Sequence, residues 1–367
     1  MSQRKYTIAH TESSMGWGGQ EIRIMAEMVG MRERGHQMLL AAPEDSKVYH
    51  VAVKEGFDTL VLSRGQLAVP LNAFRLKGWL KKKQVDIVNP HSSRDGWSAG
   101  LGGRMAGTPM IIRSRHFEVP IANKPLSRLV YTKLADHLIT TSPRISEQFQ
   151  EAFGLSAERV TTLSTGIDVE KFHPEGSTAE FPAAKGQEDW PLVGMVAVMR
   201  QAKGHVFLVR AARILKDKGF PIRILIVGDG PSQAPIDAEI AKQGLQEHVT
   251  FSGYRTDVPD ILRALDCAAF PSLHEGIPQV GLQALASGIP VTGSDVGGIP
   301  SVIRDGDTGR LFTAGDHEGL ALQLEKVFQE KEKTKQMVEN GLKLVREHHS
   351  IPVMLDQVEA LYARLIG

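Results

Sequence analysis

The residues that decide the fold are Pro271-Ser-Leu-His-Glu-Gly-Ile-Pro-Gln-Val-Gly-Leu-Gln-Ala-Leu-Ala-Ser-Gly-Ile-Pro-Val291. They follow an apolar run at 267–270 that has the length of a buried strand, and they lead into another at 290–293. Between these runs, residues 280–286 repeat apolar side chains at helical spacing. A strand, a helix and a second strand in this order predict a parallel pair joined by a crossover helix.

The same alternation continues outward along the whole chain. In the second half, the pattern predicts further strands at 192–198, 222–227 and 249–251. In the first half, helical periodicity at 20–34 lies among apolar runs at 6–10, 38–42, 59–62, 86–88, 109–113, 137–140 and 159–163. We therefore expect the α/β class, with two doubly wound, Rossmann-like domains.

The domain boundary is indicated by a change in composition. The chain has 367 residues, which exceeds the size at which one hydrophobic core stops growing, so two cores and a cleft between them are expected. Residues 174–190 have no period and many Pro, Gly and acidic residues, which is typical of a linker. We expect an N-terminal domain at 1–173 and a C-terminal domain at 191–349, with a helix at 350–367 that packs back on the first.

Composition limits the function classes. Hydrophobic residues make up 42% and charged residues 23%, as in ordinary globular proteins. The single cysteine, Cys267, lies in an apolar run, which excludes a disulfide framework and a cysteine metal site and favours a reducing compartment. No apolar run approaches 18 residues, so we expect a cytoplasmic protein without a secretion signal or a membrane span.

The charge is unevenly distributed. Residues 1–172 carry a net charge of +6 and the remainder −5, and between Arg64 and Arg144 there are 14 basic and 4 acidic residues. This excess indicates an anionic partner, either a phosphorylated glycolipid or the anionic inner face of the cytoplasmic membrane, rather than nucleic acid. The run Lys77-Gly-Trp-Leu-Lys-Lys-Lys83 is either an interfacial helix, as Trp79 and Leu80 suggest, or a solvated helix face.

Loops after the strands of the second half carry the polar residues of interest, because open parallel sheets bind ligands at the carboxyl ends of their strands. Arg200 and Lys203 precede a helix, and cations beside free N–H groups suit a diphosphate. Gly228-Asp-Gly-Pro231 either allows a ligand close to the backbone or only makes a turn. Glu275 precedes a helix N-terminus, where a carboxylate and amides suit a phosphorylated, polyhydroxylated molecule.

These motifs resemble those of family 4 of the retaining glycosyltransferases, whose members share the GT-B fold and include bacterial surface-polysaccharide and lipopolysaccharide core enzymes. The matching segments cover about 140 residues in the family's order. They are Gly-Ile-Asp-Val-Glu-Lys-Phe-His-Pro at 166–174, Lys-Gly at 203–204, Gly-Asp-Gly-Pro at 228–231, Glu-Gly-Ile-Pro at 275–278, Ala-Leu-Ala-Ser-Gly-Ile-Pro-Val at 284–291, Asp-Val-Gly-Gly-Ile-Pro at 295–300 and Val-Ile-Arg-Asp-Gly-Asp-Thr-Gly at 302–309. The first half matches more loosely, through Gly-Gly-Gln-Glu at 18–21 and His116.

The resemblance implies a role for each residue. Lys203 and Arg200 would neutralise the donor diphosphate, Glu275 would hold hydroxyls of the donor sugar, and His116 would lie near the anomeric carbon. Contacts to the nucleotide sugar would come from Gly18, Gly19, Gly228, Gly230, Gly276, Ile277, Pro278, Gln279 and Gln283. The family's members need no metal, and no cofactor beyond the nucleotide sugar is expected. His91, which also ends a strand, either contacts the acceptor or makes local hydrogen bonds.

Two positions depart from the family pattern. Gln283 stands where the family usually has a second glutamate that touches the ribose, and Arg200 falls two positions after the usual arginine, where this chain has Val198. An amide can still bond ribose hydroxyls, so Gln283 either alters donor preference or damages the site. Arg200 can serve only if its side chain points toward the donor.

The expected reaction is glycosyl transfer from a nucleoside-diphosphate sugar to a glycan or glycolipid, with retention. Breaking the glycosyl phosphate bond puts negative charge on the diphosphate, which the two cations would stabilise. No paired carboxylates of the glycosidase type are evident. The alternatives are a GT-B sugar-nucleotide epimerase or phosphorylase, and a sugar-nucleotide-binding protein without turnover.

Overall fold

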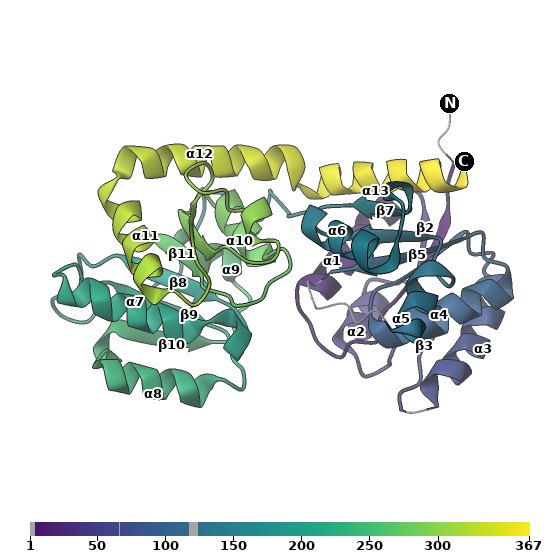
Figure 1. The fold of residues 1–367 in the computed structure, drawn as a ribbon, viewed down its shortest axis with the longest axis horizontal. Coiled ribbons are helices and arrows are strands. Elements are labelled where there is room, and N and C mark those ends of the chain that lie inside the picture. Colours follow the sequence, from purple (N-terminus) through teal and green to yellow (C-terminus); the bar gives the residue numbers. More distant parts are fainter. Residues whose placement is uncertain (1–3, 66, 117–123) are drawn as a thin grey trace. The chain divides into compact units, whose positions relative to one another are not determined.

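The computed structural model describes residues 4–65, 67–116 and 124–367. The chain forms two compact units, Met1–Gly166 together with Ile351–Gly367, and Ile167–Ser350 (Figure 1). We describe each unit by itself.

Within the described residues, the first unit contains a parallel sheet in the order β3-β2-β1-β4-β5-β6-β7. Its strands are β1 Thr7–Thr11, β2 Gln37–Ala42, β3 Asp58–Val61, β4 Ile87–Pro90, β5 Met110–Arg115, β6 His137–Thr140 and β7 Val160–Thr162. Its helices are α1 Gly19–Glu33, α2 Lys47–Lys54, α3 Ala68–Lys82, α4 Ser93–Ala106, α5 Pro125–Thr132, α6 Pro143–Phe153 and α13 Ile351–Ile366, with a 3-10 turn η1 at Ala157–Arg159.

The second unit repeats the plan with a parallel sheet in the order β10-β9-β8-β11-β12-β13. Its strands are β8 Leu192–Val196, β9 Arg223–Val227, β10 Val249–Gly253, β11 Cys267–Phe270, β12 Val291–Ser294 and β13 Arg310–Phe312. Its helices are α7 His205–Asp217, α8 Gln233–Gln243, α9 Val258–Arg263, α10 Gln279–Ala286, α11 His317–Gln329 and α12 Lys331–His348. Short 3-10 turns occur at η2 Gln201–Lys203, η3 Gln246–His248 and η4 Ile299–Ser301.

The C-terminal helix α13 completes the core of the first unit. Its side chains Met354, Val358 and Tyr362 are fully buried in one cluster with residues of α1 and the central strands. Gly30 on α1 leaves room for Leu355, since a Cβ there would lie 2.3 Å from a methyl carbon of that leucine. The face of the sheet that carries Ile8 and Ile87 is therefore covered by α1 and α13 together (Figure 1).

The two doubly wound sheets confirm the predicted fold class. The ends of the predicted strands lie within two residues of the observed ends. β13, for which Arg310–Phe312 is too short to give a pattern, was not predicted. Residues 174–190, expected as a linker, belong to the second unit. They are hydrogen-bonded to it through Ser177 to Asp260 and Gln187 to Glu247. No helix among the described residues is long and apolar enough to cross a membrane.

Candidate functional site

The carboxyl edge of the second sheet gathers the loops that carry the predicted donor residues. Hydrogen bonds between backbones hold neighbouring loops together. The loop after β8 is bonded to the loop after β9 by Met199 N to Asp229 O, 2.7 Å. It is also bonded to the loop after β11, by Leu273 N to Ala202 O, 2.8 Å. The loops after β11 and β12 are joined by Gly298 N to Gly276 O, 3.1 Å. These loops thus form one continuous surface.

Lys203 and Glu275 meet on this surface. Lys203 ends the turn η2, Glu275 lies in the loop after β11, and the Lys203 ammonium pairs directly with Glu275 Oε2. Ser272 Oγ donates to the same oxygen at 3.2 Å. The Lys203 side chain is 30% exposed and that of Glu275 12%, so the pair is partly shielded but accessible. A cation and a carboxylate 72 residues apart in sequence are thus adjacent at one site.

Arg200 is exposed at the start of the same turn, and its side chain makes no ion pair or hydrogen bond with another described residue. Val198, at the position of the family's usual arginine, is 45% exposed. Arg200 is therefore available to an incoming anion without breaking an internal contact, whereas Lys203 has to leave or share Glu275.

Gly228 and Gly230 allow the loop after β9 to pack on its neighbour. Their φ angles of 131° and 150° belong to the region that favours glycine. A Cβ on Gly228 would lie 2.2 Å from Ala197 O, and one on Gly230 2.5 Å from Met199 O. The space beside both glycines is thus filled by backbone of the loop after β8, a packing role that was not considered from sequence.

Helix α10 begins at Gln279, after Gly276, Ile277 and Pro278, so this segment forms a helix N-terminus beside Glu275. Gln283 is half-buried one turn further along. Sequence reasoning did not select Tyr254, which is 61% exposed just after β10 at the same edge of the sheet. A single tyrosine after a short strand gives no signal in sequence, and only the strand order places it near the loop after β9.

In the first unit, the predicted glycines Gly18 and Gly19 lie at the start of α1, with Gly18 as the N-cap residue. Gly18 N donates to Glu21 Oε2 at 2.8 Å. The preceding loop is fixed by Glu12, which accepts from Ser14 N at 2.6 Å and contacts the side chains of Gln20 and Ser92. The glycine loop is therefore anchored at both ends by carboxylates.

Glu12 was not selected from sequence and is fully buried. Burial, together with the nearby Asp95 carboxylate, raises the pKa of Glu12 to about 8. Asp95, also buried, caps the start of α4 and accepts from Thr11 Oγ1 and Ser13 Oγ, each at 2.9 Å. With this pKa, Glu12 is mostly protonated at pH 7, so it adds little negative charge beside Asp95.

His116 follows β5 and is 8% exposed, and residues 117–123 lie outside the described residues. Its Nε2 is 2.8 Å from Nδ1 of His91, and His91 Nε2 is 2.7 Å from Nδ1 of His10. Burial lowers the pKa of His91 and His116 well below the usual value, so both rings are neutral at pH 7. His91 therefore makes local hydrogen bonds, one of the two roles considered from sequence.

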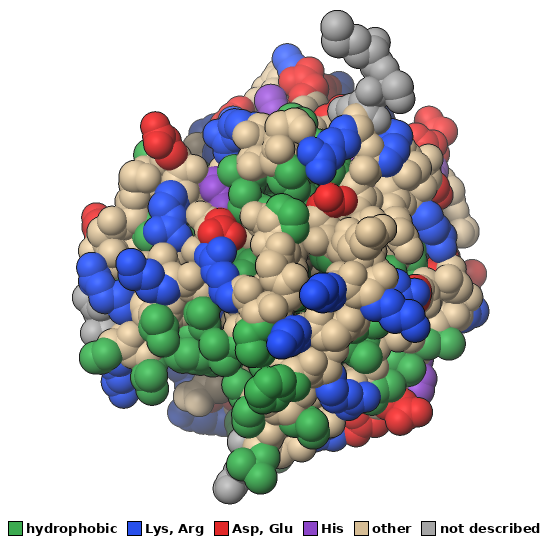
Figure 2. Space-filling model, turned by 90° about the vertical axis from the view of Figure 1, so that its right-hand side faces the viewer, with side chains coloured by type: hydrophobic (Ala, Val, Ile, Leu, Met, Phe, Trp, Pro, Cys, Tyr) green, Lys and Arg blue, Asp and Glu red, His purple; other side chains and the backbone are tan. Residues whose placement is uncertain are grey.

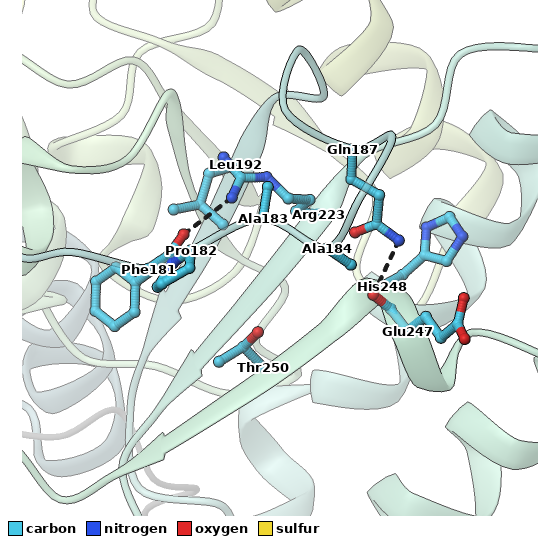
Figure 3. Close-up of a pocket in the computed structure, with 10 residues that line it drawn as sticks. All are labelled: Phe181, Pro182, Ala183, Ala184, Gln187, Leu192, Arg223, Glu247, His248 and Thr250. Carbon is cyan, nitrogen blue, oxygen red and sulfur yellow. Dashed lines mark hydrogen bonds between the residues drawn. The ribbon is translucent and has the colours of Figure 1, made fainter.

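A cavity of about 250 Å³ in the second unit lies away from these loops (Figure 3). It is lined by the first residues of strands, among them Leu192 and Arg223, and by the segment around Phe181. Two of its polar side chains are bonded to backbone, as Arg223 donates to Phe181 O and Gln187 to Glu247 O. The cavity is thus at the amino ends of the strands, opposite the predicted donor loops.

Comparison with known proteins gives the family. Residues 17–171 match the model for Glycosyltransferase Family 4, and residues 177–344 match that for Glycosyl transferases group 1. The chain is 38% identical over 313 residues to EpsF of Bacillus subtilis (strain 168), a protein assigned as a glycosyltransferase, and the match covers 80% of each chain. The chain belongs to glycosyltransferase family 4.

Two further proteins bear on this glycosyltransferase. It is 25% identical over 307 residues to the UDP-Gal:alpha-D-GlcNAc-diphosphoundecaprenol alpha-1,3-galactosyltransferase of Escherichia coli, a match that covers 78% of this chain and 77% of that one. The crystal structure of Anabaena HepE in complex with UDP superposes with a TM-score of 0.84 at 19% identity, over 98% of this chain and all of that one. The predicted GT-B architecture of two Rossmann-like units is confirmed.

Proposed function

We propose that this glycosyltransferase moves a sugar, with retention and without a metal, from a nucleoside-diphosphate sugar to an anionic glycan or glycolipid in the synthesis of lipopolysaccharide or another cell-surface polysaccharide. The observation that carries the donor assignment is the pairing of Lys203 with Glu275 beside the exposed Arg200. Cations and a carboxylate at one sheet edge offer a phosphate contact and a hydroxyl contact side by side.

The reaction follows from the charge that develops as the glycosyl phosphate bond breaks. Negative charge grows on the departing diphosphate, where Lys203 and Arg200 stabilise it together with amides at the start of α10. Glu275 accepts hydrogen bonds from hydroxyls of the donor sugar. The acceptor hydroxyl attacks from the face that the diphosphate leaves, and the leaving phosphate oxygen takes its proton.

The first unit is proposed to bind the acceptor and to supply His116 to the transferred sugar, while Gly18 and Gly19 contact donor phosphate. Its basic character supports an anionic acceptor. The E. coli relative acts, by its name, on a sugar linked to diphosphoundecaprenol, whose diphosphate is anionic. A similar lipid-linked acceptor suits this chain.

The donor class is tested by thermal unfolding with UDP, GDP, ADP, CMP and NAD, each at about a hundred times its dissociation constant. Such a ligand adds about 2.7 kcal/mol to the free energy of unfolding of the unit that binds it, which raises the unfolding midpoint by several degrees. We expect stabilisation by one nucleoside diphosphate, UDP first, because HepE was crystallised with UDP. Stabilisation by NAD alone, or by none of the five, contradicts the proposal.

A second function, sugar-nucleotide binding without turnover, is favoured by Gln283 at the position of the usual ribose-binding glutamate. A sugar-nucleotide epimerase shares the fold and differs in its product. Chromatography with mass detection, after incubation with and without a lipid-linked acceptor, separates the three. Transfer yields free nucleoside diphosphate and a heavier acceptor, epimerisation yields a donor of the same mass but different retention time, and binding changes neither.

We also propose that the first unit docks on an anionic membrane through α3. Leu67, Leu71 and Phe74 are 80%, 51% and 66% exposed and lie along one stripe of the helix at spacings of four and three residues. Lys81 and Lys82, both exposed, continue this stripe, whereas Lys83 is paired with Asp58. Figure 2, which faces the side of Figure 1 where α3 lies, shows hydrophobic side chains gathered beside Lys and Arg. Apolar and basic side chains on one helix face suit an anionic bilayer.

Co-sedimentation with phosphatidylglycerol vesicles tests this docking. Each lysine near such a surface contributes about 1 kcal/mol, so Lys81→Ser with Lys82→Ser should weaken binding roughly 30-fold. Leu71→Ser with Phe74→Ser should weaken it as well, even toward vesicles at high salt. Lys331→Ser with Lys335→Ser, which removes two exposed lysines from α12, is the matched control and should have no effect. Unchanged binding of both α3 variants overturns the proposal.

A further inference from the structure

The three histidines of the first unit form a buried series that extends to helices α1 and α13. His10 on β1, His91 after β4 and His116 after β5 are in contact in that order. At the other end, His10 Nε2 is 3.6 Å from Glu27 Oε1 on α1. Glu27 Oε1 also accepts a hydrogen bond of 2.9 Å from the Tyr362 hydroxyl on α13. His116 is thus connected through two other imidazoles to a buried carboxylate.

The contacts between the rings are hydrogen bonds in the ring planes. The ring centroids of His10 and His91 are 5.0 Å apart with planes inclined by 12°, and those of His91 and His116 are 5.1 Å apart at 26°. Each centroid separation equals the nitrogen contact plus two ring radii, so the rings meet edge to edge. His10 is fully buried, and His91 and His116 are 4% and 8% exposed, which leaves little room for water to compete.

Neutral rings allow only two proton arrangements in such a series, because each carries one N–H and each contact needs one donor and one acceptor. If His10 carries its proton on Nε2, then His91 and His116 donate from Nε2 toward His10, and Nδ1 of His116 keeps a lone pair. In the reverse arrangement, His116 carries its proton on Nδ1, and the lone pair of His10 Nε2 faces Glu27.

The charge of Glu27 favours one of these two proton arrangements. Its carboxylate accepts from Tyr362 and lies one helical turn from Arg23, whose opposite charge is also buried. A carboxylate oxygen 3.6 Å from His10 Nε2 attracts an N–H there and repels a lone pair. Burial lowers the pKa of His10, while the nearby Glu27 raises it and the more weakly acting Arg23 lowers it. The nitrogen that bears the proton in an imidazole is set by what its ring contacts.

We propose that Glu27, His10 and His91 are positioning residues that hold His116 as the Nε2–H tautomer, so that its Nδ1 accepts a hydrogen bond from a sugar hydroxyl. This inference rests on the proposed function for the contact of His116 with the sugar, but the tautomer itself is a property of the first unit alone. It gives a buried glutamate on α1 and a tyrosine on the C-terminal helix a part in orienting a group at the reaction.

The tautomers are read directly by two-bond proton–nitrogen correlation spectra of the full chain labelled with nitrogen-15 in its 13 histidines. His116→Gln identifies the signals of His116. In the wild-type protein we expect His116 with its proton on Nε2 and a bare Nδ1. His10→Phe keeps a ring of similar size but cuts the link to Glu27, so His91 and His116 should become tautomer mixtures. His137→Phe, which removes another buried histidine of the same sheet outside the series, should leave His116 unchanged.

Steady-state rates supply the second measurement. His10→Phe should lower kcat for sugar transfer about tenfold while the dissociation constant for the nucleoside diphosphate stays the same, and His137→Phe should change neither. A proton on Nδ1 of His116 in the wild-type protein overturns the proposal, as does a His10→Phe variant with the wild-type tautomer and kcat. If His10→Phe does not fold, the wild-type spectrum decides alone.

The failure of this inference and that of the proposed function are distinguishable, because the spectra need no substrate. If His116 has the expected tautomer but no nucleotide binds and no sugar is transferred, the histidine series stands and the function fails. If sugar is transferred while His116 carries its proton on Nδ1, the function stands and the series does not act as proposed.

Discussion

Lys203→Ala abolishes the thermal stabilisation by the nucleoside diphosphate and lowers kcat/KM by about 100- to 1000-fold, which is the usual loss when one donor to a developing negative charge is removed. Two effects add. The substitution removes the cation that contacts phosphate, and it leaves Glu275 as an uncompensated carboxylate at 12% exposure beside the phosphate position. Arg200 remains, so weak binding at high nucleotide concentration should persist.

The measurement is a titration of each protein with the nucleoside diphosphate, followed by initial rates of sugar transfer. Lys335→Ala is the control, because Lys335 is an exposed lysine on α12 of the same unit. It should leave affinity and rate unchanged. Full affinity in Lys203→Ala would place the diphosphate elsewhere and remove the main support for the donor site.

Glu275→Gln should act in the opposite direction on nucleotide binding. The amide frees Lys203 from its internal ion pair and removes a negative charge beside the phosphate, so affinity for the nucleoside diphosphate should rise about twofold to fivefold, the usual strength of a partly exposed pair. Transfer should fall by roughly 10- to 100-fold, since a hydrogen bond from a sugar hydroxyl to a charged group contributes about 1.5–3 kcal/mol.

Glu275→Gln should change nucleotide affinity and transfer rate in opposite directions. This difference in sign is the test, because a damaged fold lowers affinity and rate together. Calorimetric titration with UDP measures the affinity, and initial rates measure transfer. Glu332→Gln, at an exposed position on α12, is the matched control. If Glu275→Gln loses nucleotide affinity, Glu275 contacts the nucleotide itself and the proposed contact with sugar hydroxyls is wrong.

Sequence patterns predicted the elements wherever apolar runs were long enough to show a period. Strands β6 and β11 match their predicted residues 137–140 and 267–270 at both ends. The prediction for 174–190 relied on composition alone, and composition does not show whether an irregular segment is hydrogen-bonded to a domain. Gln187, for example, is 6% exposed because it bonds the backbone of Glu247.

The residues that we propose for the donor site were selected from sequence because strand ends mark the loops that meet at one sheet edge. The buried residues that support the site were not selected from sequence. Glu12, Glu27 and His10 look like ordinary polar positions near a strand or on a helix, and their burial comes from contacts with segments far away in the chain. Tyr362, which bonds Glu27, is 335 residues distant. Exposure of Leu71 and Phe74 on α3 is likewise set by which helix face packs on the sheet.

The sequence by itself thus determined two doubly wound domains and the family, because periodicity and strand-end motifs are local properties of the chain. It also selected Arg200, Lys203, Glu275 and His116 as the residues that we propose for the site. Only the tertiary structure decided that Lys203 is already paired with Glu275, that burial raises the pKa of Glu12 and that His116 ends a buried histidine series. Ion pairs, pKa values and tautomers depend on distances and burial between segments far apart in sequence, and these exist only once the sheets have formed.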